Sequence, residues 1–127
     1  MLNVNPDIVC RLIDLAREFH AQEEVSFPEV PANPSGDWAV QMLASHADDL
    51  TAQSFEALFL DLEPDQQREV VALMWLGRGD YALEDWDAAL EQAEYVCNEE
   101  SGKYLLAHPL LPAYLAEGLD LFGYGCD

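Results

Sequence analysis

Residues 70–86 read VVALMWLGRGDYALEDW and contain the main signal for the fold. Seven consecutive apolar residues end at Leu76, and a Gly-Arg-Gly-Asp turn separates them from a second helical pattern. Because glycine adopts the left-handed conformation that closes many helices, Gly77 is predicted as the C-terminal cap of a buried helix. The corner then places Trp75 and Trp86 on two consecutive helices that pack in one core.

Outward from this corner, the chain reads as helices separated by short turns, without an alternating strand pattern. Helical spacing of apolar residues predicts helices over about 6–22, around 38–43, and over about 52–62, 64–76, 83–97, 104–106 and 111–121. We therefore predict an all-α fold, a single compact domain of five to seven short helices over residues 1–127. Residues 23–36 are predicted as a proline-rich surface loop and residues 123–127 as a flexible tail.

Two of these helices have a recognisable inward stripe. In the first helix, the apolar residues at helical spacing are Ile8, Leu12, Leu15, Ala16 and Phe19. In the helix after the corner, they are Leu83, Trp86, Leu90, Ala93 and Cys97. The helix over 64–76 is apolar around most of its circumference, so it is predicted to be the most buried element.

Composition limits the classes of function. The 127-residue chain is half hydrophobic, which suits one domain with its own core, and its 25 acids against five bases give a net charge of −20. Such a field repels nucleic acid and anionic lipid, so we expect no direct binding to nucleic acid or to a membrane. The sequence shows no signal-peptide pattern and no apolar run of membrane-spanning length, which predicts a soluble, cytoplasmic protein.

The three cysteines are widely spaced and form no Cys-x-x-Cys pair. They are interpreted as thiols and not as a disulfide framework, with Cys10 and Cys97 at the edge of the core and Cys126 exposed in the tail.

No established catalytic or metal-binding motif is present. Neither His20, His46 nor His108 lies one helical turn from another histidine or a cysteine, although His46 has two acids nearby. His108, just before a proline, is expected to hydrogen-bond the backbone. We predict no catalytic residue, no metal site and no cofactor, and we favour a non-enzymatic protein.

Acidic side chains are concentrated after the corner. Residues 80–100 hold eight acids and no base, and four of the acids share one face of the predicted helix: Glu84, Asp87, Glu91 and Glu94. We call these four residues the acidic ridge. The functional interpretation is a protein-protein interaction or adaptor module whose ridge binds a basic protein. A narrower version is a nucleic-acid mimic, whose carboxylates occupy the groove of a DNA-binding protein. The alternative is that the ridge is only a solvated outer face.

A second class of function is binding of a small molecule, or enzymatic activity, in a cleft near the Gly77–Tyr81 corner. The residues that would line such a cleft are Arg78, Asp80, Tyr81, Tyr104 and His108. Arg78 is one of few bases among many carboxylates, so an ion pair is expected for it. A homodimer through Phe27 and Trp38 is a third alternative, and sequence patterns do not decide among the three.

Three stretches carry a resemblance to a known family: IVCRLIDLAREFHAQE, VVALMWLGRGDYALEDWDAALEQA and YLLAHPLLPAYLAEGLDLF. In these the chain resembles a bacterial family of small acidic helical proteins known only as a domain of unknown function. The resemblance covers nearly the whole chain and implies a single helical domain in a bacterial cytoplasm. It implies no activity and identifies no catalytic residue.

Overall fold

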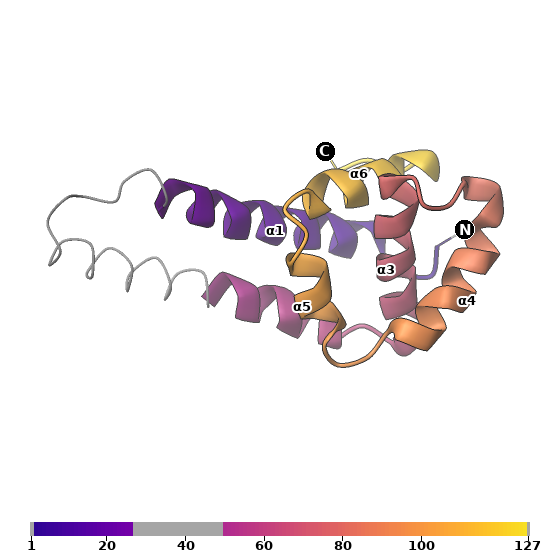
Figure 1. Ribbon diagram of the computed structural model, residues 1–127, viewed down its shortest axis with the longest axis horizontal. Coiled ribbons are helices and arrows are strands. Elements are labelled where there is room, and N and C mark those ends of the chain that lie inside the picture. Colours follow the sequence, from indigo (N-terminus) through magenta and orange to yellow (C-terminus); the bar gives the residue numbers. More distant parts are fainter. Residues whose placement is uncertain (1, 27–49, 127) are drawn as a thin grey trace, which may run out of the picture.

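A computed structural model describes residues 2–26 and 50–126, and these two segments form helices and no strand (Figure 1). One helix without a label covers residues 50–60. The others are α1 (Pro6–Ser26), α3 (Pro64–Arg78), the 3₁₀ helix η1 (Leu83–Asp85), α4 (Trp86–Val96), α5 (Ser101–Leu106) and α6 (Leu111–Leu121). The predicted all-α fold is confirmed. Residues 27–36 of the predicted loop and the predicted helix around Trp38 lie outside the described residues.

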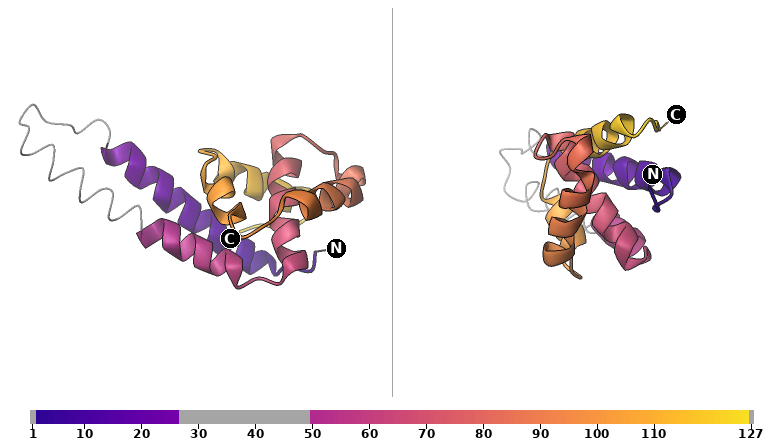
Figure 2. Two further views of the ribbon diagram at one scale, coloured as in Figure 1. Left: turned by 60° about the horizontal axis from the view of Figure 1, so that its bottom comes forward. Right: turned by 90° about the vertical axis from the view of Figure 1, so that its right-hand side faces the viewer.

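Helix α3 lies at the centre of the arrangement. It packs most extensively against α6, and it also packs against α4, while α6 makes a second large contact with α1. Figures 1 and 2 show α1 and the helix over 50–60 side by side, extending away from the end of the molecule that holds α3 and α4. This packing explains the composition of α3, because a helix covered on several sides has little room for polar side chains.

The buried residues confirm α3 as the core element and correct the details of two stripes. Every residue from Glu69 to Leu76 is buried. In α1, the buried positions include Val9 and Ile13, whereas Ile8, Leu15 and Phe19 of the predicted stripe are only partly buried. In the helix after the corner, Ala89 is buried, while Leu83 lies in η1 and is 42% exposed. The 3₁₀ turn displaces Leu83 from the face that α4 presents to the core.

The end of α3 differs from the prediction at one glycine. The helix continues to Arg78, and Gly79, with φ of 95°, is the left-handed residue that closes it. The Gly79 N–H donates to the Leu76 carbonyl and the Asp80 N–H to the Trp75 carbonyl, which is the Schellman pattern of helix ends. Gly77 was therefore predicted in the wrong role, because it lies inside the helix.

Glycine at position 77 is explained by the contact between α3 and α6. A Cβ atom on Gly77 would lie 1.8 Å from the Tyr114 carbonyl oxygen, and a Cβ atom on Gly118 would lie 2.5 Å from the Leu73 carbonyl oxygen. Each helix thus contributes a glycine at a point where the backbone of the other approaches it. These two glycines set how closely α3 and α6 pack.

A buried carboxylate holds the N-terminal segment on α3. Glu69, only 3% exposed, accepts the Val4 N–H at 2.7 Å, and its two carboxylate oxygens accept the Asn3 N–H at 2.9 and 3.0 Å. The N–H groups of Asn3 and Val4 precede α1 and have no acceptor within a helix, so Glu69 provides one. With these bonds made, Leu2 and Val4 can enter the core. The buried side chain of Glu69 therefore fixes the N-terminal segment on α3.

We predict that Glu69→Ala lowers the free energy of unfolding by about 2 kcal/mol, because it leaves the buried Val4 N–H and the part-buried Asn3 N–H without an acceptor. Glu69→Gln keeps one acceptor oxygen and should cost about 1 kcal/mol. Urea unfolding followed by circular dichroism measures both values. The exposed Glu18 provides the control, since Glu18→Ala should change stability by less than about 0.5 kcal/mol. Equal effects of Glu69→Ala and Glu18→Ala would contradict this role.

A disulfide joins Cys10 of α1 to Cys126, with their Cα atoms 5.5 Å apart and 116 positions between them in sequence. The interpretation of Cys10 and Cys126 as thiols is therefore wrong, whereas Cys97 is free and partly exposed. The chain after α6 is attached to α1 at Cys126, and Tyr124 packs against the core. The predicted tail from residue 123 did not allow for this covalent link.

Candidate functional site

The corner between α3 and η1 is closed by a local ion pair. Nε and Nη2 of Arg78 donate to the same oxygen of Asp80, at 2.8 and 2.5 Å. The pKa of Arg78 is raised above its ordinary value, chiefly because Asp80 accepts its hydrogen bond, and the Tyr104 hydroxyl contributes in the same direction. The ion pair predicted for Arg78 is confirmed, and the negative charge of Asp80 offsets the positive charge of the guanidinium.

Trp75 connects the predicted corner residues to one another. Its ring lies 6.0 Å from the ring of Tyr81, and its indole N–H donates to the Tyr104 hydroxyl at 3.2 Å. The Tyr104 ring in turn contacts His108 edge to face, with 4.9 Å between centroids. Nδ1 of His108 lies 2.8 Å from the Tyr104 carbonyl oxygen, so the expected backbone hydrogen bond of His108 is confirmed.

The structure thus brings the five predicted corner residues close together. Trp75, which was not among the predicted site residues, contacts Tyr81 and Tyr104 and accepts the Asp80 N–H at its carbonyl. Trp75 is buried and comes three residues before Arg78 on α3. Sequence patterns identified it as a core residue, and nothing in the spacing of Trp75 and Tyr104 indicates their hydrogen bond. A ligand-binding role of the five residues stays a prediction.

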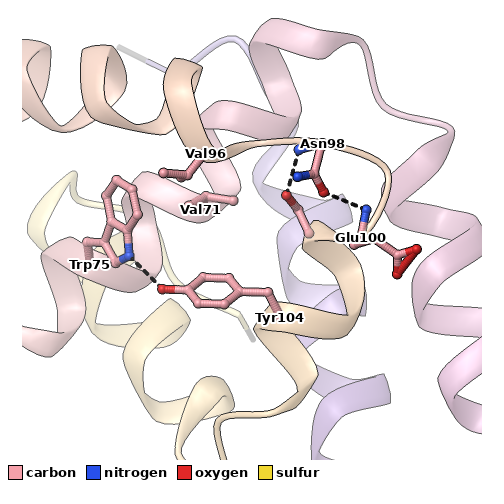
Figure 3. A pocket seen from close by; sticks show the side chains of 7 residues that line it. Val71, Trp75, Val96, Asn98, Glu100 and Tyr104 are labelled. Carbon is pink, nitrogen blue, oxygen red and sulfur yellow. Dashed lines mark hydrogen bonds between the residues drawn. The ribbon is translucent and has the colours of Figure 1, made fainter.

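A cleft of about 290 Å³ lies beside this cluster, between α3, the end of α4 and α5 (Figure 3). We call it the Trp75–Tyr104 cleft. Its lining residues are Val71, Trp75, Val96, Asn98, Glu100, Ser101 and Tyr104. Of the five predicted corner residues, Tyr104 alone lines this cleft. The other lining residues come from three helices and one turn, whose mutual placement depends on tertiary packing.

The turn before α5 forms a fixed wall of the cleft. The Asn98 N–H donates to the Ser101 hydroxyl at 2.8 Å, and the Asn98 side-chain oxygen accepts the Glu100 N–H at 2.7 Å. The Ser101 N–H donates back to the Asn98 carbonyl at 3.1 Å. Such side-chain to backbone bonds are typical of Asn and Ser at turns, and here they hold the polar side of the cleft in place. Figure 3 shows this turn opposite the Trp75–Tyr104 hydrogen bond.

Three residues of the acidic ridge, Asp87, Glu91 and Glu94, share one flank of α4, whereas Glu84 lies in η1 and not on the same helix as predicted. Glu84, Asp87, Glu91 and Glu94 are all exposed, and none forms an ion pair within the described residues. Residues two positions apart on an α-helix point about 200° apart, so Glu94 and the cleft residue Val96 lie on opposite flanks. Tyr95 lies between these flanks and is 79% exposed. The α4 part of the ridge and the cleft residue Val96 are consequently on different sides of this helix.

The described residues contain neither a metal-binding cluster nor a membrane-spanning helix. Within residues 2–26 and 50–126, no three histidine, cysteine or acidic side chains are placed to hold a metal ion together. The predicted grouping of His46 with Asp48 and Asp49 lies outside the described residues. In the same segments, no helix combines the length and the apolarity that a bilayer crossing requires.

Comparison with known families places the chain in one of them. A family model described as "Protein of unknown function (DUF3775)" matches residues 52–124, and the chain belongs to this family. The matched region extends from the helix over 50–60 to Tyr124 and includes the corner, the cleft and the acidic ridge. Comparison with curated proteins and with solved structures gives no match.

The matched range covers two of the three stretches that carry the resemblance. The two stretches around the corner and around α6 fall inside the matched region, whereas IVCRLIDLAREFHAQE in α1 falls outside it. Helix α1 nevertheless packs against α6 and carries Cys10 of the disulfide, so it belongs to the same folded unit.

Proposed function

We propose that this protein is a protein-protein interaction module whose acidic ridge binds a basic surface of a partner protein. The observation that supports the proposal is the state of the ridge: four exposed carboxylates, three on one flank of α4 and Glu84 in the preceding η1, form no ion pair with the described residues. Like charges at these spacings weaken a helix slightly. A partner that supplies lysine and arginine side chains would remove this repulsion and gain from electrostatic steering.

The exposed Tyr95 and the short extent of the ridge favour a basic protein surface as the partner over the role of a nucleic-acid mimic. Tyr95, 79% exposed, lies beside the ridge, and exposed tyrosine is enriched in protein interfaces. From Glu84 in η1 to Glu94 in α4 the ridge spans eleven consecutive residues, roughly 15 Å at about 1.5 Å per residue. A nucleic-acid mimic needs carboxylates spaced like phosphates over several helices. The general version, a basic protein surface, is therefore the one that we propose.

The test is affinity capture from a lysate of the source organism, first at low and then at high salt. The bait variant carries Glu84→Gln, Asp87→Asn, Glu91→Gln and Glu94→Gln, which changes the net charge from −20 to −16 (−20 + 4). A matched control makes the same change at exposed acids elsewhere: Glu18→Gln, Asp61→Asn, Glu117→Gln and Asp120→Asn. We expect a basic protein that the wild type and the control retain at low salt and that the ridge variant loses.

Calorimetry with the purified partner should then show a dissociation constant about 10- to 100-fold weaker for the ridge variant, because each exposed charge pair contributes a few tenths of a kcal/mol to about 1 kcal/mol. Equal losses for the ridge variant and the control would show that only the net charge matters. If neither variant loses a captured protein, the ridge is a solvated face and the proposal is wrong.

A further inference from the structure

We infer that the Trp75–Tyr104 cleft binds one large apolar side chain, which the partner presents on a short segment rich in lysine and arginine. The inference rests on the proposed function for the basic character of the partner. It concerns a different surface, because the cleft residue Val96 and the ridge residues Asp87, Glu91 and Glu94 lie on opposite flanks of α4.

The size and lining of the cleft favour a single side chain. Its volume of about 290 Å³ lies just below the range of roughly 300–1,000 Å³ that is usual for drug-sized ligands and cofactors. Val71, Val96 and the two aromatic rings give it apolar walls, and Figure 3 shows them around one space. Val96 and Tyr104 remain 43% and 41% exposed, so apolar surface at the cleft is left uncovered by the described residues.

The polar atoms of the two aromatic residues are directed toward each other. Because the Trp75 indole N–H donates to the Tyr104 hydroxyl, neither group depends on a ligand atom for this hydrogen bond. Because Trp75 is only 7% exposed, an incoming side chain would meet chiefly the Tyr104 ring and Val96, and an aromatic ligand can pack edge to face or offset on the Tyr104 ring. The turn from Asn98 to Ser101 is already hydrogen-bonded, so binding would not need to order it.

Charge at the rim points to basic neighbours of that side chain. Glu100 lines the cleft and Glu99 precedes it, both exposed. The Glu100 carboxylate pairs with Lys103 at 3.3 Å, and both side chains are more than 60% exposed. Exposed pairs of this kind are weak, so lysine or arginine of a ligand could replace Lys103. The rim therefore complements a basic segment and opposes an acidic one.

The experiment uses three blocked synthetic peptides as probes: Lys-Arg-Trp-Lys-Arg, Lys-Arg-Ala-Lys-Arg and Ser-Gly-Trp-Ser-Gly. Each is titrated into isotopically labelled full-length protein, and the indole N–H resonance of Trp75 is followed by NMR. We expect the first peptide to shift this resonance and to bind at least tenfold more tightly than each of the other two. We call Lys-Arg-Trp-Lys-Arg the tryptophan peptide and Lys-Arg-Ala-Lys-Arg the alanine peptide. Comparable binding of these two peptides would overturn the inference.

Two variants test the location of the site. Val96→Gln makes the cleft wall polar and should weaken binding of the tryptophan peptide at least fivefold. Leu121→Gln is the matched control, because Leu121 on α6 is 41% exposed and lies outside the cleft lining, and it should leave binding unchanged. Equal effects of Val96→Gln and Leu121→Gln would also overturn the inference.

The ridge variant distinguishes this inference from the proposed function. Neutralising the ridge should leave the at least tenfold preference for the tryptophan peptide over the alanine peptide intact, since the ridge does not line the cleft. If the ridge is needed for capture of a basic protein but the two peptides bind alike, the cleft inference fails and the proposed function stands. If the peptides bind as expected and capture ignores the ridge, the proposed function fails and the cleft remains a binding site.

Discussion

Gly77→Ala should lower the free energy of unfolding by about 3 kcal/mol or more, the upper part of the range for overpacked cores. In an exposed helix interior, the same change would stabilise the protein by up to about 1 kcal/mol, because alanine is the better helix former. The sign is reversed here because the new methyl group would meet the Tyr114 carbonyl oxygen at 1.8 Å. A backbone atom cannot rotate away as a side chain can, so α3 and α6 would have to move apart.

Gly118→Ala tests the other side of the same contact. Its Cβ atom would lie 2.5 Å from the Leu73 carbonyl oxygen, and we expect a loss of about 2–3 kcal/mol. Urea unfolding of the wild type and the variants measures these losses, because single domains of this size usually unfold in one cooperative step.

Two other glycines provide controls with different physical causes. At Gly102, the nearest atom to a new Cβ, at 3.2 Å, belongs to the flexible Glu56 side chain, so Gly102→Ala should change stability by less than about 1 kcal/mol. At Gly79, a Cβ meets nothing within 4 Å, but φ of 95° strains any other residue by about 1–2 kcal/mol. Losses at Gly77 and Gly118 no larger than those at Gly102 and Gly79 would contradict the close helix contact.

These glycines also show where sequence patterns succeed and where they fail. The bounds of α6 and the burial of α3 were predictable, because apolar periodicity and prolines near helix starts are local signals. The role of Gly77 was not, since both glycines of Gly-Arg-Gly can close a helix. Only the approach of Tyr114, 37 positions away, assigns Gly77 to packing and Gly79 to the cap.

The candidate site divides in the same way. The pair of Arg78 and Asp80 could be anticipated because the two residues lie within one turn. The Trp75–Tyr104 cleft could not, because it arises where α3, α4 and α5 meet around a hydrogen bond between residues 29 positions apart. The resemblance to a family of unknown function supported the helical fold and supplied no site residue.

Removal of the disulfide between Cys10 and Cys126 is expected to lower the free energy of unfolding by about 4 kcal/mol, within the range of about 2–5 kcal/mol for native disulfides. The reason is the length of the closed loop. The bond joins residues 116 positions apart and so restricts nearly the whole unfolded chain. Because spacing alone does not pair distant cysteines, this constraint was not visible in the sequence.

Urea unfolding with and without a reductant gives the value, and Cys126→Ser provides the matched variant. Without reductant, Cys126→Ser should be as unstable as the reduced wild type, and reductant should not affect it further. Thiol titration of the denatured wild type should find one reactive cysteine, Cys97, before reduction and three afterwards. Three reactive thiols before reduction would contradict the bond.

Disulfides persist in oxidising compartments and are rare in the cytosol. The same titration on protein alkylated at the moment of lysis therefore also tests the predicted cytoplasmic location: three alkylated cysteines would fit a reducing cytosol, whereas one alkylated cysteine would argue against that location.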